Sequence, residues 1–418
     1  MKNSKSLIMV IEFDCVIIGA GAAGLMAAIE SSKRGKRTLL LEKNTKPGVK
    51  ILMSGGTRCN LTQNTDTRGI ISEFGPNGRF LHSALAAFSN EDLVTYFNQR
   101  GLPTKVEETG KIFPQSDRAK DVLDVLVADA EQHQVYLNLA EPVERLEHSL
   151  NGFHIQTPKA QYVTSRVLIT TGGRSYPGCG TTGDGYQWCR AFGHTIVDTY
   201  PALAPLKTPK NSWTRNLQGV TLPELGLTIF DAKQNAVAKS QGSTLFTHVG
   251  VSGPSAMNIS KYVSTHANAD FTLAFDLLPS LNLDQKQSKL QKLITDEPRK
   301  QIDSVLKHLF PSRVVEVILE QSQINTTDRC AEIGKAKIRS LTQTIHSLQT
   351  PVTGTLGFEK AEVTAGGVSL LEVDSKTMES KFLPGLYLAG EILDLDGPIG
   401  GYNFTAAFAT GFLAGQHL

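Results

Sequence analysis

Hydrophobic residues near the start of the chain form two continuous runs, separated by a glycine-rich segment and a helical pattern. Residues 16–18 and 39–41 are all aliphatic, which predicts parallel strands that are buried on both faces. Between them, residues 19–24 read GAGAAG, and this GxGxxG spacing falls where the first strand gives way to a helix. Glu42 follows the second strand directly. The pattern predicts the first part of an α/β, Rossmann-like nucleotide-binding domain.

The glycine-rich segment is predicted to bind the pyrophosphate of a dinucleotide. Its first glycine permits the tight turn, its second lets the backbone approach the phosphates, and its third lets the helix pack closely on the strand. Glu42 is placed to bind a ribose hydroxyl. A glycine turn with a purely structural role is the alternative, but the flanking strand, helix and acid argue against it. The predicted phosphate-binding residues are Gly19, Gly21, Ala22, Ala23 and Gly24.

Later segments return to the same pattern of buried strand and glycine turn. Residues 166–171 predict a second buried strand that ends in two glycines, and residues 385–391 predict another that ends in glycine and glutamate. Residues 400–411 form a glycine turn that leads into a helix of small residues, whose first amides would face an electron-rich group. An NAD dehydrogenase does not need this C-terminal return. A long cofactor that spans the whole domain does, and FAD is the predicted one.

The middle of the chain has a different pattern. From about residue 201, short strands alternate with turns, which predicts a β-rich domain. Residues 281–323 are polar and helix-rich, while short antiparallel strands are predicted earlier, over residues 135–164. We therefore expect an FAD domain made of residues 1–195 and 356–418, interrupted by an insert of residues 196–355 with a helical subdomain at about 281–340.

Composition excludes several classes of protein. Lysines and arginines exceed aspartates and glutamates by 42 − 40 = 2, so no strong field points to nucleic acid or an acidic membrane surface. No apolar run approaches the length of a membrane span. The five cysteines are dispersed and form no CxxC motif, which argues against a flavin-disulfide reductase and a structural zinc site. We expect a cytoplasmic enzyme that holds no metal.

Several polar residues invite a chemical interpretation. The loop of residues 43–64 is predicted to line a cofactor with backbone amides and Arg58, since loops after such strands carry function. Cys59 is predicted to pack rather than to act as a redox thiol, and His194 to cap a helix end rather than to catalyse. Residues 178–183 match GxGxxG again, but a loop separates them from the preceding strand, so no second dinucleotide site is predicted.

Seven motifs in fixed order resemble one family over nearly the whole chain: IIGAGAAGL, KILMSGGTRCNLT, GKIFPQSDRAKDV, TTGGRSYPGCGTTGDGY, LFTHVGVSGP, TAGGV and GLYLAGEILDLDGPIGGYNF. It is the bacterial FAD-dependent oxidoreductase family that includes aminoacetone oxidase and the BaiN/YhiN-like flavoproteins. The resemblance implies a GR-type Rossmann-like FAD domain, interrupted by a β-barrel-like insert with a small helical subdomain. One departure is Thr57, where the family more often has glycine.

The resemblance also implies where FAD lies. Residues 19–24 would hold its pyrophosphate and Glu42 its adenosine ribose. The residues implied around the adenosine half are Lys43, Val143, Thr171 and Gly172. Those implied on the flavin side are Arg58, Cys59 and Asn60, with Gly390 and Glu391 at the ribityl–phosphate part. Gly401, Tyr402 and Asn403 would present amides to the isoalloxazine oxygen and stabilise negative charge on the reduced flavin.

The leading prediction is an FAD-dependent oxidoreductase that acts on a small organic substrate. NAD(P)H-driven reduction and oxidation of a small amine both remain open, with NAD(P)H as a transient electron donor in the first case. The alternative is a flavoprotein that binds tRNA through the helical subdomain, which carries several lysines and arginines. The near-neutral net charge argues against it. The sequence predicts no catalytic residue beyond the flavin, no particular substrate and no oligomeric state.

Overall fold

The computed structural model describes residues 10–267 and 269–418. The chain divides into two compact units. The first contains the described residues up to Tyr200 and those from Val363 to Leu418, and the second is an insert of residues 201–362. These limits lie within seven residues of the limits expected from the sequence.

A five-stranded parallel sheet forms the centre of the first unit, in the order β21-β11-β2-β3-β7. Every residue of β2, β3, β11 and β21 is buried, as expected for a parallel sheet that is covered on both faces. The strands are β2 (Cys15–Ile18), β3 (Thr38–Leu41), β7 (Tyr136–Asn138), β11 (Val167–Ile169) and β21 (Leu386–Leu388). The sheet confirms the predicted α/β class.

One strand prediction was wrong. Residues 136–138 were expected to pair antiparallel with the strands that follow them, but β7 runs parallel to β3. A parallel neighbour requires a crossover connection, and helix α6 (Ala119–Gln132) lies directly before β7 and brings the chain back in the same direction.

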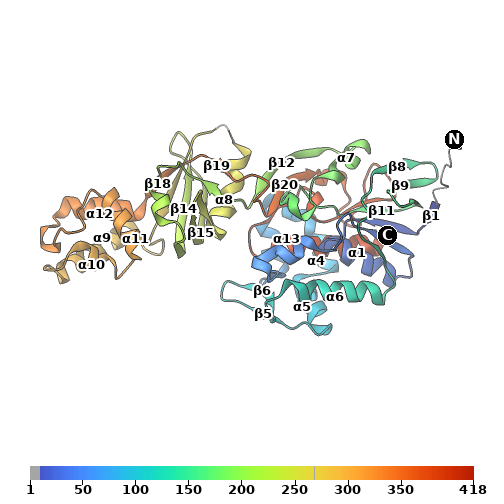
Figure 1. Ribbon diagram of the computed structural model, residues 1–418, viewed down its shortest axis with the longest axis horizontal. Coiled ribbons are helices and arrows are strands. Elements are labelled where there is room, and N and C mark those ends of the chain that lie inside the picture. Colours follow the sequence, from blue (N-terminus) through green and yellow to red (C-terminus); the bar gives the residue numbers. More distant parts are fainter. Residues whose placement is uncertain (1–9, 268) are drawn as a thin grey trace, which may run out of the picture. The chain divides into compact units, whose positions relative to one another are not determined.

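Helices α1 (Ala22–Lys33) and α13 (Tyr402–His417) pack closely together in the first unit (Figure 1). A Cβ atom on Gly411 would lie 2.3 Å from the carbonyl oxygen of Ala23, and one on Gly415 would lie 2.6 Å from that of Ala27. Small residues in α13 are therefore needed for its contact with α1. The other helices of this unit are α2 (Val49–Met53), α3 (Thr67–Glu73), α4 (His82–Ala87), α5 (Asn90–Gln99) and α7 (Asp184–Ala191).

Three smaller sheets complete the first unit. The four-stranded sheet has the order β1-β10-β9-β8, the three-stranded sheet has the order β4-β6-β5, and β12 pairs with β20. Their strands are β1 (Val10–Glu12), β4 (Thr62–Gln63), β5 (Thr104–Val106), β6 (Lys111–Pro114), β8 (Arg145–Ser149), β9 (Gly152–Gln156), β10 (Gln161–Thr164), β12 (Ile196–Ala202) and β20 (Val363–Val368).

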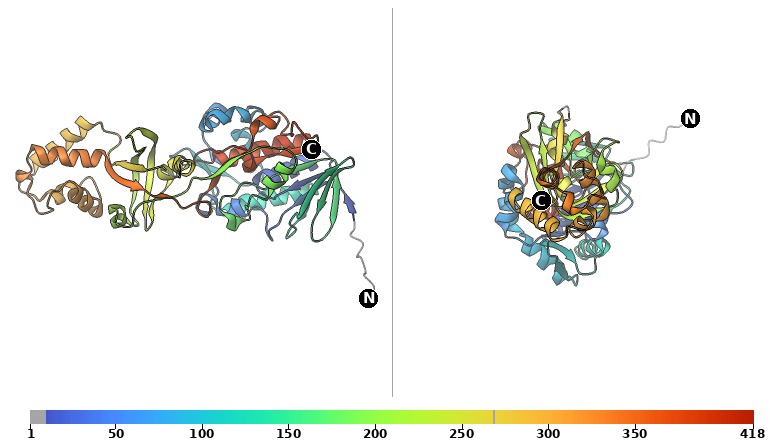
Figure 2. Two further views of the ribbon diagram at one scale, coloured as in Figure 1. Left: turned by 90° about the horizontal axis from the view of Figure 1, so that it is seen from above. Right: turned by 90° about the vertical axis from the view of Figure 1, so that its left-hand side faces the viewer.

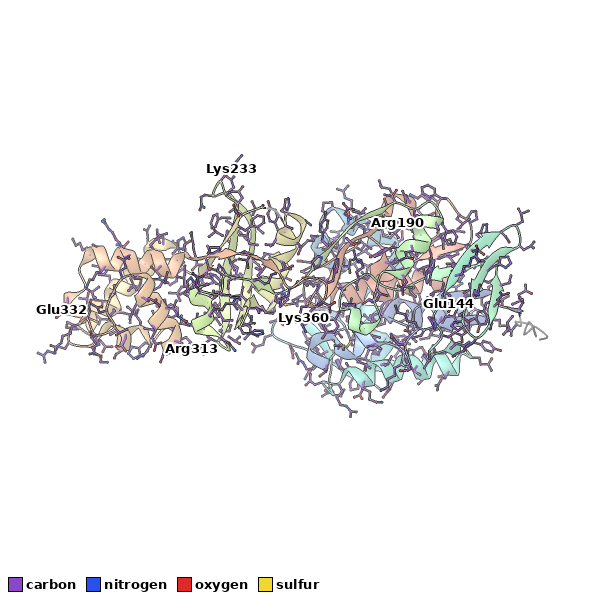
Figure 3. All side chains as sticks on the ribbon, turned by 45° about the horizontal axis from the view of Figure 1, so that its top comes forward. Glu144, Arg190, Lys233, Arg313, Glu332 and Lys360 are labelled. Atoms are coloured by element: carbon purple, nitrogen blue, oxygen red, sulfur yellow. The ribbon has the colours of Figure 1, made fainter. Side chains whose placement is uncertain are left out.

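The insert contains an antiparallel seven-stranded sheet in the order β18-β17-β14-β15-β16-β13-β19. The long hairpin β14–β15 turns near Lys233 (Figure 3), and helix α8 (Pro254–Thr265) packs on it. The strands are β13 (Leu206–Lys207), β14 (Thr221–Phe230), β15 (Ala236–Thr247), β16 (Gly250–Ser252), β17 (Phe271–Asp276), β18 (Leu348–Val352) and β19 (Gly354–Thr355).

Four helices gather at one side of the insert, and α12 contacts β17 and β18 (Figure 2). A buried lysine joins α9 to the sheet: Lys286 Nζ donates to both carboxylate oxygens of Asp276 at 2.6 Å and lies 2.9 Å from His346 Nδ1. The helices are α9 (Leu283–Asp296), α10 (Ile302–Leu306), α11 (Ser312–Gln321) and α12 (Lys335–His346). In the described part of the chain, no helix is long and apolar enough to span a membrane.

Candidate functional site: the glycine turn and its neighbours

The GxGxxG segment forms the tight turn between β2 and α1. Gly19 has a φ of +109°, and a Cβ atom there would lie 2.6 Å from the carbonyl oxygen of Thr170. A Cβ atom on Gly24 would lie 1.9 Å from the Gly19 carbonyl oxygen, so only glycine allows α1 to start this close to β2. The Thr170 hydroxyl, at the end of β11, donates to the Gly19 carbonyl oxygen at 2.8 Å.

Glu42 and the loop after it close around the same turn. The Glu42 carboxylate is buried and accepts hydrogen bonds from the backbone N–H groups of Ala20 and Asn44, both at 2.8 Å. Further along the loop, the Gly48 N–H donates to the Ala20 carbonyl oxygen at 2.8 Å. The predicted ribose-binding acid therefore lies directly beside the predicted phosphate-binding turn.

Features of this region fit a bound dinucleotide. Gly21 is the N-cap of α1, and a Cβ atom built on it would meet no atom within 4 Å, so open space lies in front of the helix. The first N–H groups of α1 have no acceptor within the helix, as at every helix start, and suit a phosphate. The buried hydroxyl oxygens of Thr171 and Tyr186 also have no hydrogen-bond partner among the described residues. FAD would supply acceptors and donors to such groups.

Glu391 is the centre of a polar network that the sequence did not predict. Lys50 Nζ donates to Glu391 Oε2 at 2.6 Å and to Ser175 Oγ at 2.8 Å. Glu391 Oε1 accepts from the Ser175 hydroxyl at 2.8 Å and from the Thr364 N–H at 3.0 Å. The preceding Gly390 packs so tightly that a Cβ atom on it would lie 2.9 Å from that of Ala23. Segments from four parts of the chain thus meet beside the glycine turn.

The C-terminal glycine turn meets the loop that begins after Glu42. The Asn60 side-chain amide makes three hydrogen bonds when its oxygen faces Gly401. The oxygen then accepts from the Gly401 N–H at 3.0 Å, and the nitrogen donates to the carbonyl oxygens of Thr62 and Ile112. The hydroxyls of Thr62 and Thr405 lie 2.7 Å apart. Because Asn60 takes the Gly401 amide, the amides of Tyr402 and the next residues, at the start of α13, are those left for a ligand.

Three other predicted residues have protein partners of their own. The Asn403 side chain accepts from the Gly397 N–H at 2.8 Å, which closes the loop before α13. Lys43 Nζ donates to Thr182 and Asp184 at 2.6 Å each, at the start of α7. Val143 is half-buried and packs against the hydrophobic core.

Arg58 points toward the β5–β6 hairpin. Its guanidinium pairs with Glu107 at 2.6 Å and with Asp117 at 3.3 Å, and it stacks 3.9 Å from the Phe113 ring centroid. These partners hold the pKa of Arg58 above its usual value. A role of Arg58 toward a cofactor stays a prediction, since its charge is already paired.

The backbone around Arg58 is unusual. Cys59 is fully buried with a φ of +61°, and burial raises the pKa of its thiol to about 12, so it is a packing residue as predicted. Thr57 has a φ of +69°, which glycine adopts at much lower cost than threonine. This conformation is consistent with the glycine that the family resemblance leads us to expect at that position.

The structure shows the surroundings of two further segments that the sequence singled out. Residues 178–183 form a loop before α7, with no strand leading directly into them. His194 does end α7 through its backbone, whose N–H donates to the Cys189 carbonyl oxygen. Its buried ring instead lies between Ser380 Oγ, at 2.8 Å, and Glu372 Oε2, at 3.2 Å, so the side chain anchors a distant segment rather than capping the helix.

Comparison with known proteins identifies the family. Residues 13–417 match the family model described as the HI0933-like protein Rossmann domain. The chain belongs to the HI0933-like family. This confirms the resemblance to the BaiN/YhiN-like flavoproteins, and the chain is therefore an FAD-dependent oxidoreductase of Rossmann type.

Members of the HI0933-like family with a named activity match nearly the full chain. A ribosomal RNA dihydrouridine synthase of Escherichia coli is 33% identical over 97% of this chain and 98% of its own length. The ribosomal RNA dihydrouridine synthase of Haemophilus influenzae is 32% identical over 95% of this chain and 96% of its own length. A 3-dehydro-bile acid delta(4,6)-reductase of Clostridium scindens is 30% identical over 96% and 97%.

Solved structures share the fold at low sequence identity. A 3-ketosteroid-delta4-(5alpha)-dehydrogenase of Rhodococcus jostii aligns with a TM-score of 0.55 and 13% identity, over 99% of this chain and 98% of its own. A 3-ketosteroid delta1-dehydrogenase of Sterolibacterium denitrificans aligns with a TM-score of 0.53 and 13% identity, over 97% and 99%.

Proposed function

We propose that this flavoprotein reduces a carbon–carbon double bond conjugated to a carbonyl group, with NAD(P)H as the electron donor. The observation that carries the proposal is the common chemistry of its named relatives. A bile acid delta(4,6)-reductase and a dihydrouridine synthase both saturate such a bond, one in a steroid and one in a uracil ring. In each reaction one bond carbon gains a hydride and its neighbour gains a proton.

The described residues supply the surroundings that this chemistry needs. When bound, FAD supplies the hydride. The turn of residues 19–24, with Glu42, would hold the nucleotide. The network of Lys50, Ser175 and Thr364 fixes the Glu391 carboxylate, and the preceding Gly390 packs against Ala23 of the turn. The first amides of α13 and the positive end of its dipole stabilise negative charge that is placed against them.

An anaerobic titration tests the proposal. The purified protein is mixed with NADPH or NADH while its visible flavin spectrum is recorded, and a conjugated enone is then added. The proposal predicts rapid bleaching by one nucleotide and recovery of the flavin band on addition of the enone. A flavin that neither nucleotide bleaches would contradict it and would favour the amine oxidase alternative, for which aminoacetone and oxygen are the first reactants to try.

A second candidate function is the same reduction carried out on a uridine of ribosomal RNA. It is favoured by the names of two relatives that are 32% and 33% identical to this chain. In the helical part of the insert, Lys289, Lys292 and Arg299 are exposed, but other basic residues are already used within the chain. Lys286 is buried, Lys300 and Lys307 pair with Glu297 and Asp303, and Arg313 (Figure 3) donates to backbone carbonyls of Asn216 and Gln218.

The RNA candidate has its own test. Ribosomal RNA from a host that lacks its own synthase is digested to nucleosides after this chain is expressed, and dihydrouridine is measured by mass spectrometry. Appearance of dihydrouridine would establish RNA as a substrate. Its absence, together with enone reduction by the same protein, would leave the small-molecule reductase.

A further inference from the structure

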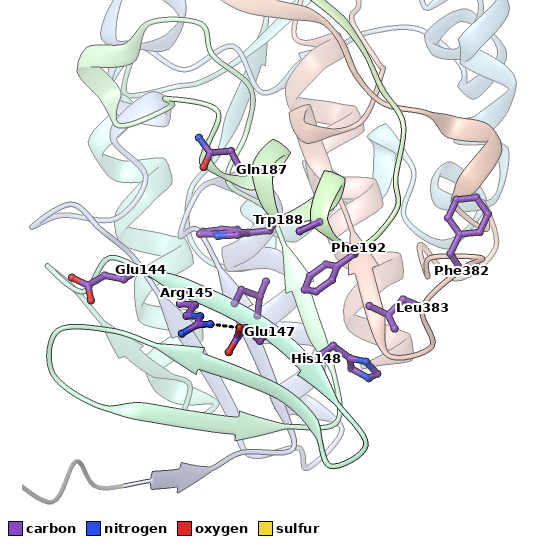
Figure 4. A pocket seen from close by; sticks show the side chains of 11 residues that line it. Glu144, Arg145, Glu147, His148, Gln187, Trp188, Phe192, Phe382 and Leu383 are labelled. Atoms are coloured by element: carbon purple, nitrogen blue, oxygen red, sulfur yellow. Dashed lines mark ion pairs between the residues drawn. The ribbon is translucent and has the colours of Figure 1, made fainter.

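A groove of about 690 Å³ runs along the outer edge of β8 in the first unit (Figure 4). One wall is β8 itself, with the residue before it, and the other is formed by α7 and the segment at Phe382. Trp188, Phe192, Phe382 and Leu383 give the groove an apolar side, and Phe382 is 54% exposed. Trp188, Phe192 and Leu383 are half-buried, so Phe382 is the exposed member of this apolar side. An apolar groove with an exposed aromatic side chain is typical of an interaction surface.

Strand β8 is an edge strand. It pairs with β9 on one side, and within the described residues no strand pairs with its other side. Ser149 and Gly152 close the two-residue turn of this hairpin, so the alternation of an antiparallel pair directs the backbone groups of Leu146 and His148 toward the open edge. Such an edge is a ready template for another strand.

When two copies of β8 are placed antiparallel, residues of opposite charge lie across from each other. Residues 144–148 read Glu-Arg-Leu-Glu-His, and all except Leu146 are exposed. Within one chain, the Arg145 guanidinium pairs with the Glu147 carboxylate at 2.6 Å (Figure 4), and both side chains stay more than half exposed, so each can also meet a charge on the partner subunit. If two copies pair antiparallel about Leu146, Arg145 of one lies opposite Glu147 of the partner subunit on the same face, and this pair occurs twice. Glu144 in the same way faces the partner's His148. Opposite charges on directly opposed residues stabilise a strand pair.

Other registers lack this complementarity. Pairing about Glu147 would place two glutamates directly opposite each other, where like charges destabilise the pair. Pairing about His148 would place Arg145 opposite the uncharged Asn151 of the partner subunit. The charge pattern therefore selects one occupant of the edge, a second copy of this chain, and one register, centred on Leu146.

The two-fold symmetry of this strand pair would also bring the apolar sides of the two grooves together. Antiparallel pairing of two identical edges puts the two-fold axis perpendicular to the joined sheet, so the α7 helices of both copies lie on the same face. Phe153 of β9 contacts Phe192 of α7 at 6.0 Å between ring centroids, which shows that α7 covers the inner face of this sheet. Trp188, Phe192 and Phe382 would then pack against their own equivalents across the axis.

We propose that the protein is a two-fold symmetric homodimer, joined through β8 into a continuous eight-stranded sheet, with the aromatic side of the groove closed across the axis. The four-stranded sheets of two copies supply the eight strands. An interface of standard size buries about 800 Å² per partner, and a strand pair flanked by aromatic side chains is suited to reach it.

Light scattering of the full-length holoprotein tests the dimer. The proposal predicts a dimer for the wild type and a rise of about tenfold or more in the dimer dissociation constant for Glu147→Arg, which turns two attractive pairs into repulsive ones. The charge swap R145E/E147R restores opposite charges and should restore the dimer. Glu131→Arg, on an exposed position of α6, is the matched control and should remain dimeric. A monomeric wild type, or a Glu147→Arg variant that dimerises like the wild type, would overturn the proposal.

Cysteine cross-linking tests the register. Arg145→Cys protein and Glu147→Cys protein are oxidised separately and as a mixture. The native cysteines of the described chain are all buried, which limits background cross-linking. The proposed register predicts a disulfide-linked dimer in the mixture and little in either variant alone. A strong cross-link of Glu147→Cys with itself would indicate pairing about Glu147 and contradict the proposal.

Discussion

Replacement of Gly21 by valine separates cofactor binding from folding. Gly21 has φ −82° and ψ −168°, a conformation open to any residue, and a Cβ atom there meets nothing within 4 Å. Valine at an N-cap costs about 1 kcal/mol, and its lower entropy in the unfolded chain offsets part of that cost. The Gly21→Val protein should therefore fold with a free energy of unfolding within about 1 kcal/mol of the wild type.

The same side chain would fill the space before the first amides of α1. Two amide hydrogen bonds to a charged phosphate contribute about 4 kcal/mol together. Their loss weakens FAD binding by about 1,000-fold, so the Gly21→Val protein should purify colourless.

Two other glycines provide contrasting variants. Gly24→Ala forces a Cβ atom to 1.9 Å from the Gly19 carbonyl oxygen, so the helix must shift. We expect a loss of about 3 kcal/mol and a fall in Tm of about 6 °C or more. Gly178 belongs to the second GxGxxG segment, and a Cβ atom there also meets nothing within 4 Å. Gly178→Val should keep both fold and FAD.

Flavin absorbance per mole of protein, thermal unfolding and titration of FAD into the apoprotein measure these outcomes. A folded Gly21→Val protein with stoichiometric FAD would refute the placement of the cofactor at residues 19–24. Loss of FAD in Gly178→Val with the fold intact would move the site to the second glycine segment.

Three further predictions concern ionisable side chains that are buried or half-buried. Lys286→Met leaves the Asp276 carboxylate without its lysine, and we expect urea unfolding to show a loss of about 3 kcal/mol. Burial lowers the pKa of His194 below its ordinary 6.5, so the unfolded chain takes up its proton first as pH falls. The wild type should lose stability below about pH 6.5 more steeply than His194→Gln, as measured by urea unfolding at several pH values. Lys50→Met removes the cation that pairs with the Glu391 carboxylate, so this carboxylate is no longer held in place. We expect the dissociation constant for FAD to rise at least tenfold, as measured by titration of FAD into the apoprotein.

The strand, the glycine turn, the helix after it and the acid beside the turn could be predicted from local patterns, because each part is continuous in sequence. A buried strand, three glycines at fixed spacing and an acid at the end of the next strand are short-range features. The Lys50–Glu391 pair is different: its partners are 341 positions apart, and only the assembled sheet brings them together. Arg58 shows a different case: its loop was predicted to line the cofactor, but its charge is paired with Glu107 in the turn of the β5–β6 hairpin and with Asp117 after β6.

The small residues of the C-terminal helix show how one pattern can serve two purposes. Sequence reasoning assigned the helix after residue 400 to the cofactor because of its exposed first amides. The structure adds that Gly411 and Gly415 let α13 approach α1 closely, while β21 pairs with β11 in the central sheet. The C-terminal segment thus completes both the sheet and the helical layer of the first unit. The fold of the first unit therefore depends on contacts between its own two segments, which is why the chain can carry a long insert at residues 201–362 without interrupting the central sheet.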